Sequence, residues 1–434
     1  MKSYLNLFIT FFFFVSCHQE KSPFILKNSD NSITVELHSV VNKNLVYRVL
    51  KNNNVVIDSS HLGLIRDDSD FYNELNISKF PEVKLVSDRY TMLQGKQKDI
   101  SYNANEYIVQ TINKDGKKMN VIFRLSDDGV AFRYHFPEDS IGIKRIIEEK
   151  TTYNFNEETR GWLQPMSRAK TGWKSVNPSY EEHYEMGAPV NKKSPIKEGW
   201  VYPALFKTGD TWALISETSL DDNYCGTRLK YNNEVGAFQV TFPQKEEVFP
   251  NRALNPESTL PWYTPWRILT IGSLKTITES TLGTDLAEKA IDMDTSFIKS
   301  GLSSWSWVLL KDDFTNYETS LKFIDYASKM NWAYCLIDAD WDQKIGYDKM
   351  NELTKYAASK NVKILVWYNS AGSWNTTPYT PKDKLLTSES RAKEFKKLNE
   401  IGVSGVKIDF FGGDGQSMIA YYHGILKDAA KHKL

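Results

Sequence analysis

The sequence predicts a protein with a large N-terminal β-sandwich followed by the first four βα units of a (β/α)8 TIM barrel. Two observations predict this fold class. From about residue 32 to residue 269, short alternating apolar and polar runs are separated by Asn, Asp and Gly turns, which is typical of antiparallel sheets. After Gly301, near-continuous apolar runs alternate with helical stretches, as expected for a parallel sheet that is buried on both faces.

The N-terminus, residues 1–17, predicts a lipoprotein signal peptide. Lys2 gives a positive start, and residues 5–15 form an apolar run that is too short for an ordinary transmembrane helix. The run ends at residues 14–17 (FVSC), which resemble a bacterial lipobox, so Cys17 is the expected lipidation site. A plain secretory signal is the alternative. Both alternatives predict export, and the lipoprotein interpretation places the protein in the periplasm or outer membrane of a Gram-negative bacterium.

The composition excludes some classes of function. The chain has 434 residues with 54 Lys+Arg and 54 Asp+Glu, so its zero formal charge offers no basic surface for nucleic acid. If Cys17 carries lipid, only Cys225 and Cys335 remain, far apart in the sequence. A disulfide framework is therefore not expected. Cys335 lies in an apolar run and is expected to be a small core residue.

Residues 18–280 are assigned to the β-sandwich. Residues 32–37, 46–49 and 121–125 alternate in the manner of half-buried strands, and residues 52–54 (NNN) and 127–129 (DDG) supply turns between strands. Residues 281–300 predict a helical linker to the second domain.

Residues 301–434 predict four successive βα units. Strands are expected at 303–309, 333–338, 362–368 and 405–411, and helices at 317–330, 347–359, 388–400 and 416–431. A doubly wound sheet is the competing fold, but no phosphate-binding glycine fingerprint follows the first strand. Because four units do not close a barrel, we expect the sequence to be part of a longer protein or a truncated gene product.

The most informative motif is residues 405–416 (GVKIDFFGGDGQ), a strand that ends on a carboxylate and passes into glycines. Alternate side chains of a strand share one face, so Lys407 and Asp409 are expected to point the same way. Catalytic groups of βα barrels gather at the carboxyl ends of the strands. The alternative is an ordinary strand-end Asp that caps the next helix.

Other polar and aromatic residues stand at the ends of the predicted strands. Trp305 lies in the first predicted strand, Asp338 ends the second, and Asp340 and Trp341 come just after it. Carboxylates and Lys can hold the hydroxyls of a neutral sugar, and Trp can stack on its apolar face. The alternatives are core packing for each Trp and a surface loop for Asp340.

Several stretches together resemble glycoside hydrolase family 97, namely residues 127–134 (DDGVAFRY), 265–267 (PWR), 304–307 (SWSW) and 366–372 (VWYNSAG). The family combines a β-sandwich with a (β/α)8 barrel and a small C-terminal β-domain. Its retaining members carry an Asp in the context Val-Lys-Ile/Val-Asp-Phe-Phe-Gly-Gly-Asp-Gly-Gln, which is complete at residues 406–416.

The resemblance implies a retaining α-galactosidase whose nucleophile is Asp409 and whose partner is an α-galactoside oligosaccharide. A monomer is expected, although no sequence feature indicates the oligomeric state. In related α-galactosidase families, a Lys and Asp residues before a Trp stand at the positions of Lys407, Asp338, Asp340 and Trp341. The family's acid/base is a Glu of the second barrel half, which this sequence lacks, and Asp414 is not proposed instead. The alternatives are an inverting α-glucosidase of the same family and a non-catalytic, carbohydrate-binding lipoprotein fragment.

The resemblance also implies Ca²⁺ near the active site. One ligand is expected from the sandwich, in residues 179–184 (SYEEHY). Either Glu181 or Glu182 fits, and Glu181 is preferred. Carboxylate oxygens suit this ion, although the remaining family ligands belong to the barrel half that the sequence lacks. The alternative is an exposed acidic loop.

Overall fold

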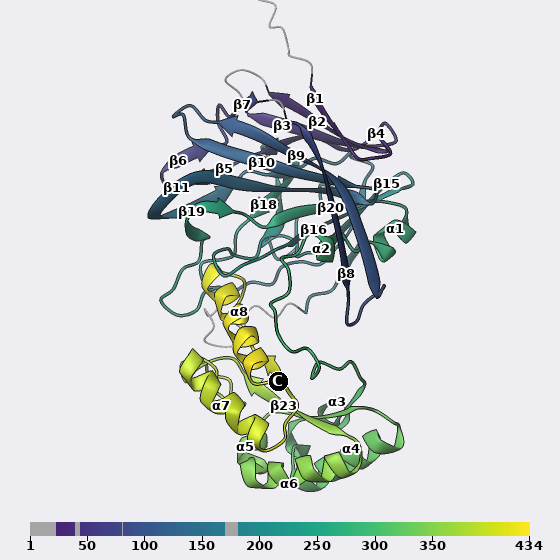
Figure 1. Cartoon of the computed structure of the whole chain (residues 1–434), viewed down its shortest axis with the longest axis vertical. Helices are drawn as coiled ribbons and strands as arrows, with labels where there is room; N and C mark the ends of the chain where they lie inside the picture. Colours follow the sequence, from purple (N-terminus) through teal and green to yellow (C-terminus); the bar gives the residue numbers. More distant parts are fainter. Residues whose placement is uncertain (1–22, 40–43, 80, 170–180) are drawn as a thin grey trace, which may run out of the picture.

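A computed structural model describes residues 23–39, 44–79, 81–169 and 181–434. The β-rich N-terminal part lies at one end of the molecule and the α/β part at the other (Figure 1). The predicted signal peptide, with Cys17, lies outside the described residues. Within the described ranges, no helix has the length and apolar character needed to cross a membrane.

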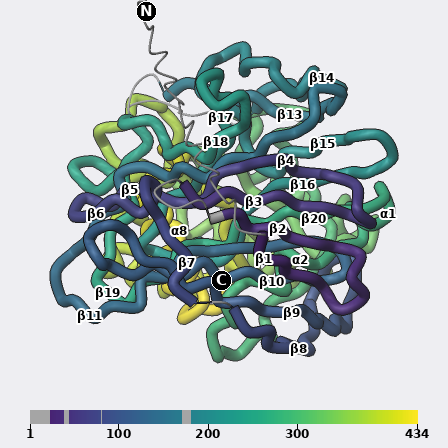
Figure 2. The backbone as a smooth tube through the Cα atoms, turned by 90° about the horizontal axis from the view of Figure 1, so that it is seen from above, coloured from purple at the N-terminus to yellow at the C-terminus, as the bar shows by residue number. Residues whose placement is uncertain are grey.

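The N-terminal part is built from antiparallel strands that pair mostly with their neighbours in sequence. One sheet has the order β1-β2-β3-β4, with β1 (Phe24–Lys27), β2 (Ile33–Ser39), β3 (Leu45–Lys51) and β4 (Asn54–Leu62). In Figure 2 these strands run side by side. A small sheet has the order β12-β18-β17, with β12 (Thr152–Tyr153), β17 (Arg228–Asn232) and β18 (Ala237–Thr241).

The larger sheet contains thirteen strands, counted over the described residues, along a main path β14-β13-β15-β16-β20-β11-β10-β9-β7. The strands β5, β6, β8 and β19 branch from this path. The members are β5 (Leu64–Arg66), β6 (Ser69–Phe71), β7 (Asn76–Lys79), β8 (Val83–Thr91), β9 (Asp99–Ile112), β10 (Lys118–Ser126), β11 (Gly129–Glu149), β13 (Arg160–Leu163), β14 (Glu185–Pro189), β15 (Ala204–Thr208), β16 (Thr211–Thr218), β19 (Glu257–Tyr263) and β20 (Trp266–Gly272).

The sandwich core lies between the first sheet and the larger one. Alternate residues of β3, namely Leu45, Tyr47 and Val49, are buried in one cluster with Phe123 and Phe132 of the larger sheet. The Tyr47 and Phe132 rings meet edge to face at 5.6 Å. Each large apolar side chain buried in this way contributes about 1.5–3 kcal/mol. The predicted sandwich-like N-terminal domain is confirmed.

The predicted helical linker over residues 281–300 is wrong for most of its length. Two short helices, α1 (Leu274–Glu279) and α2 (Leu282–Asp285), lie at its start, and residues 286–302 are irregular. Most side chains of residues 287–302 are exposed. A helix in a protein depends mainly on burying an apolar face, and this segment has little surface to pack against.

The C-terminal part contains four parallel strands whose spatial order follows the chain order, β21-β22-β23-β24. A doubly wound sheet reverses its strand order, so that alternative does not fit. The elements are β21 (Ser303–Trp305), α3 (Ser306–Leu310), η1 (Asp312–Phe314), α4 (Tyr317–Lys329), β22 (Tyr334–Ile337), α5 (Trp341–Lys344), α6 (Gly346–Ser359), β23 (Lys363–Asn369), α7 (Ser388–Glu400), β24 (Gly405–Asp409) and α8 (Gln416–Lys431).

The predicted strand over residues 303–309 is wrong after Trp305, because the chain turns there into α3. The helices α7 and α8 have the predicted bounds. The start of α7 is fixed by a capping box. The Thr387 side chain accepts a hydrogen bond from the Ser390 amide, and the Ser390 side chain accepts one from the Thr387 amide.

The two faces of the parallel sheet have different roles. Cys335, Val366 and Tyr368 are buried in a cluster with residues of α6, α7 and α8. The predicted core role of Cys335 is thereby confirmed, and both Cys225 and Cys335 are buried free thiols. The register pairs Trp367 with Lys407 and Asn369 with Asp409. The Lys407 and Asp409 side chains therefore lie on one face, opposite to that of Val406 and Ile408.

Candidate active site

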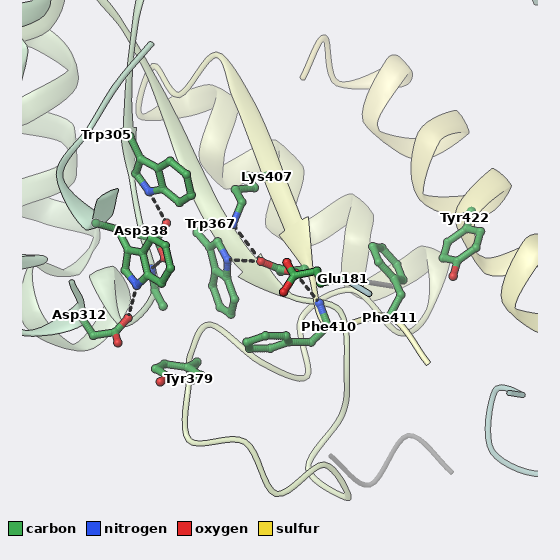
Figure 3. A pocket seen from close by; sticks show the side chains of 13 residues that line it. Glu181, Trp305, Asp312, Asp338, Trp367, Tyr379, Lys407, Phe410, Phe411 and Tyr422 are labelled. Carbon is green, nitrogen blue, oxygen red and sulfur yellow. Dashed lines mark hydrogen bonds and ion pairs between the residues drawn. The ribbon is translucent and has the colours of Figure 1, made fainter. Parts of the chain in front are cut away.

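A cavity of about 670 Å³ lies at the carboxyl end of the parallel sheet. Figure 3 shows side chains from different strands and loops converging on it. It is lined by Glu181, Trp305, Trp307, Asp312, Asp338, Ala339, Trp367, Tyr379, Lys407, Asp409, Phe410, Phe411 and Tyr422. The predicted residues Asp409, Lys407, Asp338, Trp305 and Glu181 are therefore brought together.

Asp409, the last residue of β24, receives three hydrogen bonds. The Lys407 ammonium donates to Oδ2 at 2.9 Å, and the Trp367 indole donates to the same oxygen at 3.3 Å. The Phe410 amide donates to Oδ1 at 3.0 Å. The Asp409 side chain is still 43% exposed. Its carboxylate is thus held in place on one side and open to the cavity on the other.

Burial by itself would raise the pKa of Asp409, but the hydrogen bond and positive charge of Lys407 outweigh that effect. The amide of Phe410 and the indole of Trp367 act in the same direction as Lys407. The pKa of Asp409 is therefore below its ordinary value. Its carboxylate is ionised at neutral pH, as a nucleophile requires.

The backbone turns sharply just after this carboxylate. Phe410 has φ 62°, a left-handed conformation that is rare for a large side chain. Its ring packs edge to face on Trp367 at 5.5 Å and against Tyr379 at 5.8 Å. Strained residues of this kind cluster at functional sites, where the surrounding structure holds them. The residue that donates its amide to Asp409 is thus also the one held in the left-handed conformation.

Lys407 lies between two indoles. Its ammonium is 5.1 Å from the Trp305 ring centre and 5.9 Å from the Trp367 ring centre. Both distances are within cation–π range. One of its three donors is used by Asp409, and the side chain is 35% exposed. Lys407 can therefore orient the carboxylate and also donate to a bound hydroxyl group.

A layered group of indoles and carboxylates forms the opposite wall. The Trp305 and Trp307 rings stack at 5.2 Å. The Trp305 indole donates to Asp338 at 2.5 Å, and the Trp307 indole donates to Asp312 at 2.8 Å. Asp338 is nearly buried, at 4% exposure, and its other oxygen accepts from the Ala339 amide at 2.7 Å. Asp338 therefore holds Trp305 in position as well as lining the cavity.

Two predicted substrate contacts do not line this cavity. Trp341 is fully buried, and its indole donates to the Trp367 carbonyl at 2.9 Å. Asp340 accepts from the Thr380 amide at 3.0 Å and lies 3.5 Å from Lys344. The sequence pattern was correct in placing both residues after the second strand. Because α5 begins at once, however, Trp341 turns into the core and Asp340 binds a neighbouring loop.

The two acidic residues predicted as alternatives for a metal ligand differ in position. Glu181 lines the cavity (Figure 3), whereas Glu182 accepts from the Ser167 hydroxyl at 3.1 Å. Over the residues that the structure describes, no group of three or more His, Cys, Asp or Glu side chains could hold a metal ion. Ca²⁺ takes six to eight oxygen ligands, so the described residues do not by themselves fit a calcium site.

The sequence did not single out Asp312, Tyr379, Phe410, Phe411 and Tyr422 as site residues. Asp312 raises the pKa of Tyr379 through its negative charge and a hydrogen bond. Tyr422 comes from α8, and its hydroxyl donates to the Gly413 carbonyl at 2.5 Å. Asp312 does follow the first strand, where barrel active sites collect polar groups. Phe410 and Phe411 belong to the motif at residues 405–416, which could have pointed to them, whereas Tyr379 and Tyr422 show no local pattern that would have distinguished them from core aromatics.

The arrangement combines an ionised carboxylate, a neighbouring ammonium group and aromatic walls in a cavity large enough for a small molecule. Ligand sites of this kind pair apolar walls with a few polar groups that fix orientation. The polar groups suit hydroxyls, and the indoles suit an apolar ring face. Asp409 is the group best placed for attack on an electrophilic carbon.

Two family models match almost the whole described chain. The model for Glycosyl-hydrolase 97 N-terminal matches residues 26–289, and the model for Glycoside hydrolase 97 matches residues 302–434. The boundary between them falls in the irregular segment that follows α2.

The chain is 28% identical to a probable retaining alpha-galactosidase of Streptomyces bingchenggensis (strain BCW-1), with 90% of this chain and 57% of the relative covered. It is 25% identical to a retaining alpha-galactosidase of Bacteroides thetaiotaomicron, with 96% and 64% covered. The chain thus spans less than two thirds of the length of either relative.

Among solved structures, the chain is similar to that of a beta-arabinopyranosidase, with a TM-score of 0.91 and 36% identity over 94% of this chain and 65% of that one. It also resembles a family 97 enzyme from Pseudoalteromonas sp. strain K8 in complex with panose, with a TM-score of 0.75, 20% identity and the same coverage. At that identity, the second likeness shows a shared fold alone.

Proposed function

Because the chain belongs to glycoside hydrolase family 97, we propose that it is a retaining exo-glycosidase that removes terminal α-galactosyl residues. One observation carries this proposal. Asp409 faces the cavity with its carboxylate bonded by Lys407 and Trp367. The similarity to two retaining alpha-galactosidases supports the same branch of the family.

In the first step, an Asp409 oxygen attacks the anomeric carbon. A C–O ester bond forms as the glycosidic C–O bond breaks, and the departing oxygen takes a proton from a second carboxyl group about 5 Å from the nucleophile. Lys407 keeps Asp409 ionised before the attack, and the Phe410 amide fixes the direction of the carboxylate. Trp305 and Trp367 supply apolar surface for the ring.

In the second step, the second carboxyl group takes a proton from water. The water oxygen bonds to the anomeric carbon and the ester bond breaks, which frees Asp409 and releases the sugar with its original configuration. We assign the acid/base role to no residue of this chain. Asp414 lines a different cavity and lies 3.7 Å from Arg228, so it is a poor candidate.

The finer fold proposal is that the parallel sheet is half of a (β/α)8 barrel. Its strand order supports this proposal, because a barrel of this kind adds strands in chain order. The position of the cavity at the carboxyl ends of the strands supports it as well.

A β-L-arabinopyranoside is a second candidate substrate. The ring of β-L-arabinopyranose has the configuration of α-D-galactopyranose without the hydroxymethyl group. The likeness to a beta-arabinopyranosidase, at 36% identity, favours this candidate. The same Asp409 mechanism would serve both rings. Selectivity between the two substrates would therefore depend on whether the cavity wall leaves space for the hydroxymethyl group, which the arabinopyranoside lacks.

An inverting α-glucosidase and a non-catalytic binding protein are less favoured. An inverting enzyme activates water with a base set farther from the anomeric carbon, whereas Asp409 already faces the cavity. A binding protein would not need a carboxylate whose pKa is held below its ordinary value by a neighbouring Lys.

Calcium, the lipid anchor and the location are further proposals. Glu181 lines the cavity and would give Ca²⁺ one ligand, but it is a single carboxylate, so no catalytic step is derived through the ion. Export to the periplasm or outer membrane follows from residues 1–17, with Cys17 as the lipid site. A monomer is proposed as well.

A glycosyl fluoride tests the nucleophile directly. Fluoride departs without protonation, so formation of the glycosyl-enzyme needs Asp409 but no acid. We expect 5-fluoro-α-D-galactosyl fluoride to label the full chain once, on Asp409, as located by peptide mass spectrometry. Asp409→Asn is expected to abolish labelling.

Comparison of fluorides separates the candidates. Faster labelling by β-L-arabinopyranosyl fluoride would favour the second substrate, and labelling by the α-glucosyl donor would reject galactosyl selectivity. Labelling at another residue, or none with any donor, would reject the proposed mechanism.

A further inference from the structure

The loop that follows the candidate nucleophile is held by the sandwich domain. Residues 410–415 join β24 to α8, and Glu247 of the sandwich bonds this loop at two places. Its Oε2 accepts from the Asp414 amide at 3.1 Å, and its carbonyl accepts from the Gly415 amide at 2.9 Å. The Gly226 amide donates to the Asp414 carbonyl at 2.9 Å.

Glu247 is itself fixed by a buried ion pair. Arg228 donates to both of its carboxylate oxygens at 2.8 Å, and the two side chains are 3% and 0% exposed. The Gln244 amide donates to the same carboxylate at 2.9 Å. Separating the members of such a buried pair is costly, because it leaves an uncompensated buried charge.

The approach of the two domains is close enough to require glycine. A Cβ on Gly413 would lie 2.4 Å from the Glu247 Cβ, and a Cβ on Gly415 would lie 2.4 Å from the Glu247 carbonyl oxygen. Gly413 also has φ 137°, which L side chains rarely adopt. The loop can therefore pass over Glu247 in this manner only without side chains at these positions.

The sandwich also caps the next helix. The first N–H groups of a helix have no partner inside it, and the cap residue of α8, Gly415, has no side chain to supply one. The Gln416 and Ser417 amides instead donate to the carbonyls of Leu254 and Ala253, at 2.9 and 3.0 Å. Both ends of the segment between Asp409 and α8 are thus fixed, one by β24 and the other by the sandwich.

We propose that Glu247 is a positioning residue, which acts through the 410–415 loop to hold Asp409 and Phe410 in their reactive geometry. This proposal rests on Asp409 being the nucleophile. The loop connects to the cavity a second time through Tyr422, whose hydroxyl donates to the Gly413 carbonyl. A displacement of the loop would therefore move the carboxylate and one wall of the cavity together.

The test compares two buried ion pairs in the full chain. Glu247→Gln leaves Arg228 with Asp414 as its remaining acidic partner, and Glu149→Gln likewise leaves Arg267 with Glu217. Both glutamates are fully buried, but only Glu247 contacts the loop. We expect Glu247→Gln to slow labelling of Asp409 by the glycosyl fluoride about 10- to 100-fold. Glu149→Gln is expected to label at the wild-type rate below its unfolding temperature.

Two further measurements keep the test decisive. Gly413→Ala should slow labelling as Glu247→Gln does, while Gly95→Ala should not, because Gly95 has a similar φ of 133° and nothing within 4 Å of an added Cβ. Hydrogen exchange of residues 410–417, which needs no activity, should rise in Glu247→Gln and stay unchanged in Glu149→Gln.

The two proposals fail in different ways. Wild-type chain that is not labelled on Asp409 would reject the nucleophile. Unchanged exchange in residues 410–417 of Glu247→Gln, or labelling in Gly413→Ala as fast as in Gly95→Ala, would reject the positioning role.

Discussion

Trp341 provides a sharp test, because its sequence position predicts sugar contact while the structure buries it. Its indole donates to the Trp367 carbonyl at 2.9 Å and its ring packs edge to face on Tyr347 and Tyr368. Trp341→Phe removes the hydrogen bond, which costs about 1 kcal/mol. The smaller ring leaves a void that costs about another 1 kcal/mol. The expected loss in the free energy of unfolding is therefore about 2 kcal/mol.

The assay is urea unfolding followed by the helical circular dichroism signal, which comes mainly from α4, α6, α7 and α8. A loss of this size should lower the urea midpoint by about 1 M. Trp332→Phe is the control, because Trp332 is only partly buried against the same core, and it should cost less. The affinity for galactose should be unchanged in both variants.

A different result would refute the assignment of Trp341 to the core. If Trp341→Phe weakened galactose binding while the urea midpoint stayed at the wild-type value, the side chain would have to contact the sugar. The cavity would then have to extend past Trp367 toward α5. That outcome would restore the original sequence-based prediction for Trp341.

Three further predictions concern the carboxylates of the site. Lys407→Met should raise the pKa of Asp409, because Lys407 lowers it, so the acidic limb of the labelling rate should move to higher pH. The lowered pKa of Asp409 also contributes to the stability of the fold. That contribution is present above the ordinary carboxyl pKa and is lost as the pH falls through the lower pKa of the folded state. An unmoved limb would contradict the pairing. Asp409→Gly with added azide should give a galactosyl azide of inverted configuration from the α-galactosyl fluoride, as followed by NMR, and no azide product in a folded variant would count against the nucleophile. Asp338→Asn should weaken galactose binding, measured by calorimetry, roughly 10-fold. The Trp305 indole then loses its charged acceptor, and hydrogen bonds to charged groups contribute about 1.5–3 kcal/mol. Equal affinity would show that Asp338 is not needed to hold Trp305 in position.

The sequence predicted the long helices best. The bounds of α7 and α8 agree with the prediction because strong local signals coincide there, including a capping box at Thr387 and an apolar stripe that meets the sheet. The first strand was predicted too long, because a short apolar run such as residues 303–309 fits a strand or a buried helix equally well. The predicted helix over residues 281–300 was wrong for a different reason. The composition favours a helix, but most of these side chains are exposed and have no apolar surface of the fold to pack against.

The site residues were predictable where the alternation of side chains along a strand alone decides which way they point. Lys407 and Asp409 share a face because strand side chains alternate, and the structure joins them at 2.9 Å. The failure at Trp341 and Asp340 has a local cause, since Asp340 adopts φ 66° and starts α5 at once. Tyr379 and Tyr422 reach the cavity from a loop and a helix face, and such convergence depends on packing rather than on sequence spacing.

The glycines of the motif at residues 412–415 have a cause that the sequence alone does not reveal. They read as a flexible turn after the nucleophile, yet the loop they form is tightly held. Gly413 and Gly415 are required because Glu247 of the other domain fills the space where a side chain would stand. The motif that marks the candidate nucleophile therefore also encodes the contact between the domains. It follows that the α/β part expressed without the sandwich would keep Asp409 in its sequence but lose the partner of the Asp414 and Gly415 amides.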